Sequence, residues 1–356
     1  MEVATRPIDQ EKLTAFLEQM VQELAVVISS GLVVVGDRLG LYRAMADGRP
    51  VSDAELAATT GVDLHYLHDW LVNQAAGGYV EYDAATDRYR LTPEQALILA
   101  GLDGPLDAPG GFISMTALVQ AADRIAGVMR TGGGMSWGEH HHGLFEGTER
   151  FFKGAYRTSL VQQWIPALDG VAAKLRAGAR VADVGCGHAA STIIMAQAYP
   201  NSRFVGFDAH APSIEHARQA AEEAGVADRV TFAVADAASY PGQDYDLIAY
   251  FDCFHDLPAP YRSAQHSYQA LAPDGTVMLV EPMAGNTVAE NLNPVGRFAS
   301  AASVLVCRPN ALATSDVALG TIAPDAAIEG MVRRAGFSHF RRATETPFNR
   351  VFEARR

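Results

Sequence analysis

The chain has few of the residues that would assign it to a secreted, disulfide-stabilised class. It contains only 3 cysteines, and Cys186, Cys253 and Cys307 stand far apart with no paired spacing. A disulfide framework needs paired cysteines, so this pattern indicates reduced thiols in a cytoplasm. The first residues, among them Glu2 and Arg6, are charged and are followed by no cleavage pattern, so we predict no signal peptide.

Positive charge is also scarce. The 28 lysines and arginines are outnumbered by 41 aspartates and glutamates, which gives a formal net charge of −13. A chain with this balance repels nucleic-acid phosphates and anionic lipids unless its charge is strongly segregated. The apolar run from Leu24 to Gly36 is shorter than the roughly 20 residues that a membrane span needs. We therefore expect a cytoplasmic protein with no nucleic-acid partner and no membrane partner.

The chain is long and rich in apolar residues. Its 356 residues exceed an ordinary single domain, and 49% of them are hydrophobic, which provides an ample core. We predict an N-terminal helix and winged-helix-like dimerisation domain over 1–100. A helical connector and substrate lid follows over 101–165, with a loop expected at 101–111 and helices at 112–129 and 149–167, and an α/β domain occupies 166–356.

The N-terminal pattern predicts helices followed by a hairpin. Residues 8–35 form one helix that is polar at first and then apolar on nearly every side, so a second copy of the chain is its natural cover. We therefore expect a homodimer. A capping box, Ser52-Asp-Ala-Glu55, opens one of the later helices. The elements expected after the first helix, in the order of a winged helix, are helices at 39–45, 53–59 and 64–76 and strands at 79–82 and 88–91.

Winged helices often bind DNA, but the charge of this one argues against that function. From Asp37 to Glu94 there are five basic and ten acidic residues. The helix at the recognition position carries Asp63 and Asp69 and no lysine or arginine, whereas a groove reader needs the opposite balance. We expect this domain to form the dimer and to cover the substrate.

From residue 178 onward, apolar strand patterns alternate with helical ones. Alternation of this kind predicts a parallel sheet with helices on both faces. The last two strands flank Thr346-Pro347 and should be antiparallel. The strands are expected near 180–184, 203–207, 230–234, 246–251, 276–281, 337–345 and 348–354.

The most specific signal is the stretch Val181-Ala-Asp-Val-Gly-Cys-Gly-His-Ala-Ala190. It predicts a buried strand, a glycine turn and a helix. Gly185 and Gly187 lack a Cβ, so the turn can be tight and a ligand can lie against the backbone. The helix that follows aims its unpaired N–H groups at that ligand. Asp208, at the end of the next strand, can accept both hydroxyls of a ribose, which completes a nucleoside-binding half-site.

The same stretch formally fits a dinucleotide fingerprint, G-x-G-x-x-G/A. However, Asp183 stands two residues before the first glycine, where it would repel a pyrophosphate but suits a positive amino group. Asp236-Ala237 follows a third strand and suits an adenine rim. The chain then ends in a strand pair, with no second mononucleotide half. An NAD-dependent oxidoreductase is therefore the least favoured interpretation.

As a set, the motifs VADVGCG, VGFD, VADA and LAPDGTVMLVEP resemble the class I S-adenosylmethionine (SAM) methyltransferases, over about residues 179–356. The N-terminal part resembles the winged-helix-like domain of bacterial small-molecule methyltransferases, which are related to plant-type O-methyltransferases. The resemblance implies an α/β fold, with a Rossmann-like seven-stranded methyltransferase domain behind a mainly helical dimerisation domain, and SAM as cofactor. The residues expected to bind SAM are Asp183, Gly185, Cys186, Gly187, Asp208, Ala209, Asp236, Ala237 and Phe251.

His255 is the candidate general base. It lies just past the fourth strand, at the edge where catalytic groups gather in open parallel sheets, and histidine titrates near neutral pH. Plant-type O-methyltransferases carry a catalytic His-Asp pair here, which His255-Asp256 matches, although Leu257 stands where they have tryptophan. The alternatives for His255 are a strand-end cap or a metal ligand. Glu281 follows the fifth strand and has two possible kinds of role. It either orients His255 or binds a polar substrate, or else it caps a helix or stands exposed to solvent.

A second group of candidates is His140-His-His142. Three adjacent histidines cannot all face one point, so they form a solvated loop, contact the substrate, or supply at most two ligands to a metal. Some α-keto-acid C-methyltransferases of this superfamily hold a metal with histidines, but the segment 298–310 offers Cys307 and no histidine here. Asn291 and Asn293 line the acceptor pocket or serve packing. We predict no bound metal, and the predicted substrate contacts are Trp137, His141, His142, Phe152, Tyr156 and Arg297.

The sequence thus predicts a SAM-dependent methyltransferase that acts on a small molecule, by O-methylation with a histidine base. C-methylation of an activated carbon, such as that of an α-keto acid, with or without a metal, is the alternative. A SAM-sensing DNA-binding regulator is the alternative of a different class.

Overall fold

The computed structural model describes residues 7–315 and 317–356 and contains two compact units, Met1–Thr116 and Ala117–Arg356. The division falls inside the segment 101–165 that we expected to connect two domains. Each unit has a hydrophobic core of its own.

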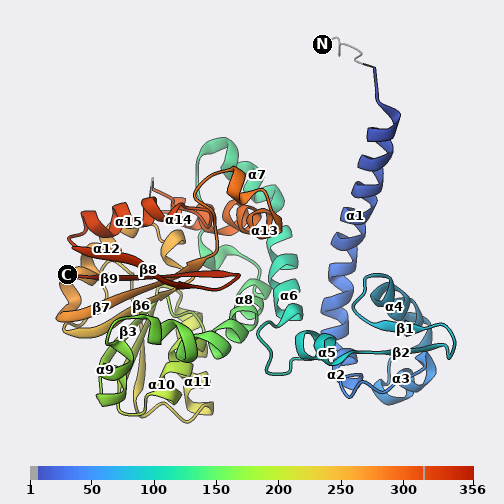
Figure 1. The fold of residues 1–356 in the computed structure, drawn as a ribbon, viewed down its shortest axis with the longest axis horizontal. Helices are drawn as coiled ribbons and strands as arrows, with labels where there is room; N and C mark the ends of the chain where they lie inside the picture. Colours follow the sequence, from blue (N-terminus) through green and yellow to red (C-terminus); the bar gives the residue numbers. More distant parts are fainter. Residues whose placement is uncertain (1–6, 316) are drawn as a thin grey trace. The chain divides into compact units, whose positions relative to one another are not determined.

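The first unit is a long helix followed by a winged-helix arrangement (Figure 1). Asp9 caps the long helix by accepting from the backbone N–H groups of Glu11 and Lys12. The predicted capping box is present, because Ser52 and Glu55 bond each other's backbone N–H groups. The elements are α1 (Gln10–Arg38), α2 (Leu41–Ala44), α3 (Asp53–Thr60), α4 (Leu64–Ala76), β1 (Glu81–Asp83), β2 (Arg88–Arg90) and α5 (Pro93–Leu99).

Helix α1 is longer and more exposed than its apolar run suggests. It has 29 residues, and its most apolar stretch of 18 residues has a mean hydropathy of 1.6 and is 11% buried. By length and composition alone, it would reach across a bilayer, so the expectation that this segment is too short applies to Leu24–Gly36 but not to the whole helix. The same measures are met by a helix whose apolar side chains are covered by another protein surface.

The second unit is built on a seven-stranded sheet with the order β5-β4-β3-β6-β7-β9-β8. The first five of these strands are parallel, and β9 is antiparallel to both of its neighbours, as the sequence predicted. The chain order reverses between β3 and β6. The strands are β3 (Arg180–Val184), β4 (Arg203–Asp208), β5 (Val230–Val234), β6 (Tyr245–Phe251), β7 (Leu271–Pro282), β8 (His339–Glu345) and β9 (Asn349–Arg355).

Helices cover both faces of this sheet, so it is buried between two apolar layers. In Figure 1, α9 (Val171–Ala177), α10 (Ala190–Ala198) and α11 (Ala211–Glu223) lie on one face. On the other face lie α12 (Pro260–Ala270) and α15 (Asp325–Arg334). The Rossmann-like fold class predicted from the alternating pattern is confirmed.

The helices between the winged helix and the sheet differ from the prediction at their ends. The helix expected at 112–129 is two helices, α6 (Ala108–Val119) and α7 (Ala122–Thr131), which meet at a bend of 56°. The loop expected up to residue 111 therefore ends earlier. The helix expected from 149 begins at residue 143, as α8 (Gly143–Ala155), and continues into a π-helical stretch, η2 (Tyr156–Trp164), and a short turn, η3 (Ile165–Ala167).

A last group of short elements connects β6 to β8 and carries several site residues. They are η4 (Phe254–Asp256), η5 (Ala289–Asn291), α13 (Pro294–Ala302), η6 (Ser303–Cys307) and α14 (Arg308–Leu312), while η1 (Trp137–Glu139) precedes α8.

Candidate active site

The predicted site residues gather where the strand order reverses. The carboxyl ends of β3, β4, β6 and β7 meet at one edge of the sheet because these strands are parallel. Ligands of open α/β sheets bind outside this edge, at the reversal point.

The glycine turn after β3 has the geometry that its residues require. Gly185 has a φ of 76°, and a Cβ there would lie 2.7 Å from the sulfur of Cys253, so a side chain does not fit. Gly187 has a φ of 52°, and a Cβ there would have nothing within 4 Å, so this side of the turn is open. The N–H groups of Gly185 and Cys186 donate to the carbonyl of Phe207, which ties the turn to β4.

Asp183 is a fully buried carboxylate with one oxygen available. Its Oδ2 accepts from the hydroxyls of Ser191 at 2.7 Å and Thr192 at 2.6 Å. Its Oδ1 has no hydrogen-bond partner among the described residues. Burial raises the pKa of Asp183 to about 6 against the effect of those two hydroxyls. An unpartnered buried carboxylate oxygen suits a positively charged ligand group, as the sequence predicted for the amino group of SAM.

Asp208 holds the glycine turn as well as facing it. Its Oδ2 accepts from the N–H of Gly187 at 2.9 Å and its Oδ1 from the N–H of His210 at 2.8 Å. Burial raises its pKa despite these bonds. Each carboxylate oxygen has two lone pairs, so both retain capacity for the hydroxyls of a ribose. The open turn, the unpartnered Asp183 oxygen and this carboxylate therefore fit SAM.

The other predicted SAM residues lie around this centre. Asp236 is exposed and accepts from the N–H of Ala238 at 2.7 Å, and Ala209 is exposed beside Asp208. Phe251 is buried at the end of β6. The side chain of Cys186 is buried on the inner side of the turn, against Gly206 of β4.

His255 lies in η4 with both ring nitrogens engaged. Its Nδ1 is 2.7 Å from Oε2 of Glu281, at the end of β7, and its Nε2 is 3.3 Å from the sulfur of Cys307 in η6. His255 is 3% exposed and Glu281 is fully buried. Burial alone would lower the pKa of His255, but the Glu281 carboxylate and the Cys307 sulfur together outweigh burial and raise this pKa well above its ordinary value.

This geometry shows which of the two acidic residues, Glu281 or Asp256, contacts the His255 ring. Glu281, and not Asp256, bonds the His255 ring, and its Oε1 also accepts from the N–H of Phe254 at 3.1 Å. Asp256 is held through its backbone, whose carbonyl accepts from the Asn310 side chain at 3.0 Å. Burial raises the pKa of the Asp256 carboxyl to about 7.

Sequence reasoning missed Asp252, which lies between β6 and His255. It adopts a φ of 52°, which is uncommon for a residue with a side chain. Its carboxylate accepts from Tyr156 at 2.9 Å and from Asn349 at 2.8 Å, and burial raises its pKa to about 7. Tyr156, a predicted substrate contact, is thus a buried residue that bonds Asp252. The only sequence signal for Asp252 was its place directly after β6.

The three adjacent histidines are divided by the fold. His140 is 6% exposed, and neither of its ring nitrogens has a partner among the described residues, while burial lowers its pKa. His141 and His142, which we predicted to contact the substrate, are exposed and pack on each other with ring centroids 4.0 Å apart.

The remaining predicted substrate residues occupy different surroundings. Trp137 packs on Phe145, whose ring in turn packs on His210 beside Asp208. Phe152 stacks on Tyr156 with ring centroids 6.0 Å apart. Arg297 is exposed on α13.

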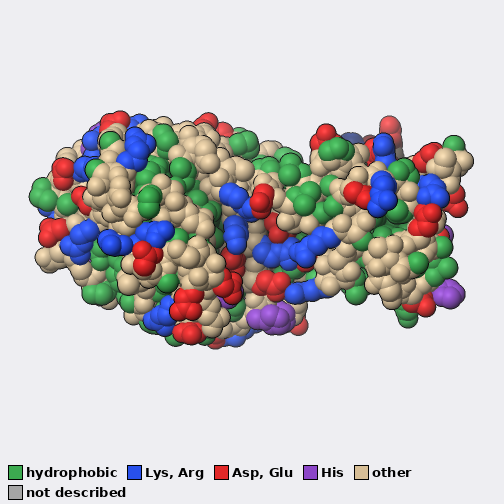
Figure 2. All heavy atoms as spheres, turned by 90° about the horizontal axis from the view of Figure 1, so that it is seen from below, with side chains coloured by type: hydrophobic (Ala, Val, Ile, Leu, Met, Phe, Trp, Pro, Cys, Tyr) green, Lys and Arg blue, Asp and Glu red, His purple; other side chains and the backbone are tan. Residues whose placement is uncertain are grey.

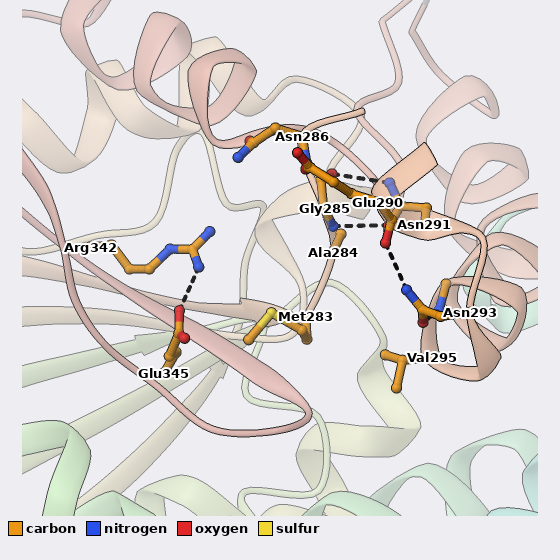
Figure 3. A pocket seen from close by; sticks show the side chains of 11 residues that line it. Met283, Ala284, Gly285, Asn286, Glu290, Asn291, Asn293, Val295, Arg342 and Glu345 are labelled. Atoms are coloured by element: carbon orange, nitrogen blue, oxygen red, sulfur yellow. Dashed lines mark hydrogen bonds and ion pairs between the residues drawn. The ribbon is translucent and has the colours of Figure 1, made fainter. Parts of the chain in front are cut away.

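A cavity of about 300 Å³ is lined in part by Asn291 and Asn293, which the sequence left as candidates for the acceptor pocket, and it does not include His255 (Figure 3). It is lined by residues of the segment 283–296, after β7, and by Arg342 and Glu345 of β8. Asn291 bonds the backbone of Gly285, and Asn293 donates to a backbone carbonyl of its own loop at 2.7 Å. These amide side chains therefore stabilise the loop. This is the second of the two roles that the sequence left open for them, namely packing.

The winged-helix unit has mixed surface charge. On the face drawn in Figure 2, basic and acidic side chains are interspersed. Arg88 pairs with Glu55, and Arg90 pairs with Glu81. Helix α4, at the recognition position, has no lysine or arginine in its sequence.

Comparison with known proteins assigns both parts of the chain. Residues 175–309 match the family described as a methyltransferase domain, and residues 25–101 match the Rv2258c-like winged HTH domain. The chain therefore contains a methyltransferase domain behind a winged HTH domain. Its glycine turn, Asp208 and the His255-Glu281 pair all lie within the first match.

Proteins similar to this chain are known in sequence and in structure. It is 31% identical to 27-O-demethylrifamycin SV methyltransferase of Amycolatopsis mediterranei over 170 residues, 45% of this chain and 60% of that protein. The mitomycin 7-O-methyltransferase structure superposes with a TM-score of 0.72 at 17% identity, covering 98% of this chain and 100% of the other. Human N-acetylserotonin methyltransferase, solved in complex with SAM, gives 0.67 at 16% identity, covering 100% and 99%. The chain spans less than two thirds of the length of the curated relatives it matches.

Proposed function

We propose that this methyltransferase transfers the methyl group of SAM to a hydroxyl group of a small molecule, with His255 as the general base. The observation that carries the proposal is the bond between His255 Nδ1 and Glu281, which orients the ring so that Nε2 can accept a proton once the acceptor hydroxyl replaces Cys307 as its neighbour. A curated relative and a structural neighbour are named as O-methyltransferases of small molecules, which supports a hydroxyl as the acceptor.

In this mechanism SAM supplies the methyl group, and the protein positions the reactants and accepts one proton. Asp183 and Asp208 hold the cofactor beside the glycine turn. The acceptor hydroxyl takes the place beside His255 Nε2 that the sulfur of Cys307, at 3.3 Å, fills in the ligand-free protein. The methyl group passes from the sulfonium sulfur of SAM, which leaves as a neutral thioether, to the acceptor oxygen, and the O–H proton of the acceptor goes to Nε2. Glu281 stabilises the resulting imidazolium, as the buried carboxylate does in other carboxylate–histidine pairs.

Orientation provides much of the rate enhancement in such a reaction, up to roughly 7–11 kcal/mol in favourable cases. The buried His255-Glu281 pair adds a base whose ring cannot rotate freely. Because Glu281 and Cys307 raise the pKa of His255, the neutral ring that accepts a proton becomes abundant only at a higher pH than for an ordinary histidine.

A second candidate function is metal-assisted C-methylation of an activated carbon. It is supported by His255, Asp256 and Cys307, which each offer one ligand atom, all within 4.8 Å of one another. In that case His255 would be a metal ligand and would not accept the proton.

We further propose a cytoplasmic homodimer in which α1 and the winged-helix unit form the contact between subunits. Exposed apolar side chains along α1 support this arrangement, since large uncovered apolar patches mark interaction sites. The acidic character of the winged-helix region and the lack of basic residues in α4 support a role without DNA.

The test combines one variant and one chelator. With a hydroxyl acceptor found by screening for SAM-dependent product, His255→Ala should lower the methyl-transfer rate constant by roughly 10²–10⁴-fold. SAM affinity in calorimetry should stay nearly constant, because the cofactor contacts lie elsewhere. EDTA should leave wild-type activity intact. Loss of activity on chelation, together with a bound metal that His255→Ala releases, would instead favour the metal-assisted reaction, and a variant within a factor of about two of wild type would remove His255 as the base.

A further inference from the structure

A second cluster of ionisable side chains lies beside the glycine turn, away from His255. Glu149 comes from α8, His188 from the turn itself, and His216 from α11. Glu149 Oε2 is 2.9 Å from His188 Nδ1 and 3.5 Å from His216 Nε2. One carboxylate oxygen is therefore flanked by two ring nitrogens from separate elements.

The residue types and spacing suit a divalent transition metal. Each of the three side chains offers one ligand atom, and these atoms lie within 4.8 Å of one another. A tetrahedral Zn²⁺ with bonds near 2.0–2.2 Å brings its ligand atoms to about 3.3–3.6 Å apart, close to the spacing around Glu149 Oε2. Two histidines and one glutamate with an open fourth position form a known zinc ligand set.

For all three side chains to bind one ion, one histidine ring must first change its orientation. The rings of His188 and His216 lie nearly face to face, with centroids 4.0 Å apart and planes 26° apart, so their lone pairs do not yet converge on one point. The His216 side chain is 49% exposed, whereas those of His188 and Glu149 are 14% and 18% exposed. The exposed ring is thus free to turn toward an ion that the two more buried ligands already border.

Glu149 supplies the negative charge of the cluster, and the two histidines beside it bind a metal through neutral imidazole nitrogens. Lys153 lies 3.8 Å from the other carboxylate oxygen and is half-exposed, so it can move into solvent when the ion arrives.

We propose that Glu149, His188 and His216 form a binding site for a divalent metal of the zinc type, with solvent at the fourth position. Such an ion would join α8 to the glycine turn and to α11, the two elements on either side of the cofactor-binding carboxylate Asp208. The proposal does not depend on His255 or on the reaction catalysed.

The experiment is a titration of the full-length, metal-stripped protein with Zn²⁺ in calorimetry and with Co²⁺ as a spectroscopic probe. Wild type should bind one equivalent in this cluster and give the visible absorption of tetrahedral Co²⁺. Glu149→Gln, which keeps the shape and a hydrogen-bonding side chain, should weaken binding by at least about tenfold, and His216→Ala should do the same.

Two controls separate this site from other metal binding. His65→Ala removes a highly exposed imidazole that lies 3.2 Å from Asp63, and it should leave the affinity unchanged. Cys307→Ser alters the buried His255 cluster and should also leave the affinity unchanged. The proposal is overturned if wild type binds no Zn²⁺, if Glu149→Gln and His216→Ala bind as wild type does, or if only Cys307→Ser reduces binding.

Discussion

The Nδ1 of His255 lies 2.7 Å from Oε2 of Glu281, although the two residues are 26 positions apart in the chain. Both side chains are buried; His255 follows β6, and Glu281 lies at the carboxyl end of the neighbouring parallel strand β7. The pairing of these strands therefore positions the candidate base, because it brings the ends of both strands to one edge of the sheet.

Glu281→Gln should lower the methyl-transfer rate constant by about 10²–10⁴-fold, the range for loss of a general base. A glutamine no longer stabilises the imidazolium, and its N–H₂ group favours the wrong ring tautomer. Removing the negative charge also lowers the pKa of His255, so the ascending limb of the pH–rate profile should move to lower pH. A profile whose limb stays in place would show that this pair does not control the reaction, and His140→Ala serves as a control for loss of a different buried imidazole.

Asp183→Asn should weaken SAM binding and flatten its pH dependence. The pKa of Asp183 is raised to about 6 in the ligand-free protein, so its carboxylate is largely protonated at pH 5 and ionised at pH 7. A positively charged ligand group favours the ionised form, and wild-type affinity should therefore rise between pH 5 and pH 7. Calorimetric titration at several pH values measures this. Parallel pH dependence in wild type and variant would contradict the assignment of Asp183 to the charged end of SAM.

Asp208→Ala should reduce SAM affinity far more than it reduces the free energy of unfolding. The carboxylate should accept two ribose hydroxyls, at roughly 1.5–3 kcal/mol for each bond to a charged group. Some stability is lost as well, since Asp208 also bonds the N–H groups of Gly187 and His210. Calorimetry and thermal unfolding separate the two effects. Asp236→Ala, at an exposed carboxylate, should cost less affinity, and an unchanged affinity in Asp208→Ala would place the cofactor elsewhere.

The protein should be a stable dimer that depends on α1. Leu24, Val27 and Ile28 are 68%, 63% and 77% exposed, and a charge at the centre of this strip would be buried without a partner in the dimer. Ile28→Asp should therefore shift the dimer toward monomer in light scattering at micromolar concentration. Glu18→Gln is a control on the same helix and should leave the mass unchanged. A monomeric wild type would refute the dimer.

The local pattern of the sequence was enough to predict the order of the elements. The glycine turn, the alternation of strands and helices, and the antiparallel last pair were all found in the expected places, because periodicity and turn residues act over a few positions. The ends predicted for the helices that correspond to α6 and α8 were wrong. A bend between two helices and a helix start at Gly143 depend on packing against distant residues, which a local pattern does not report.

The cofactor site was also largely contained in the sequence, since Asp183, Gly185 and Gly187 are neighbours in one motif, and Asp208 follows the next strand. The chain alone did not reveal that one oxygen of Asp183 would lack a partner, nor that Asp208 would hold the turn. Both depend on hydroxyls and N–H groups that only the folded helix and turn bring into contact.

Only the tertiary structure decided the surroundings of the candidate base and the roles of the histidines. Cys307 reaches His255 from 52 residues away, and Glu281 replaces the adjacent Asp256 as the partner of the ring. Of three identical neighbours, His140 is buried and His141 is exposed, because their direction follows from how the segment before α8 packs. The local motifs and the family that they resemble indicated the fold and the cofactor, whereas contacts between residues far apart in sequence determined which side chains face each other at the site.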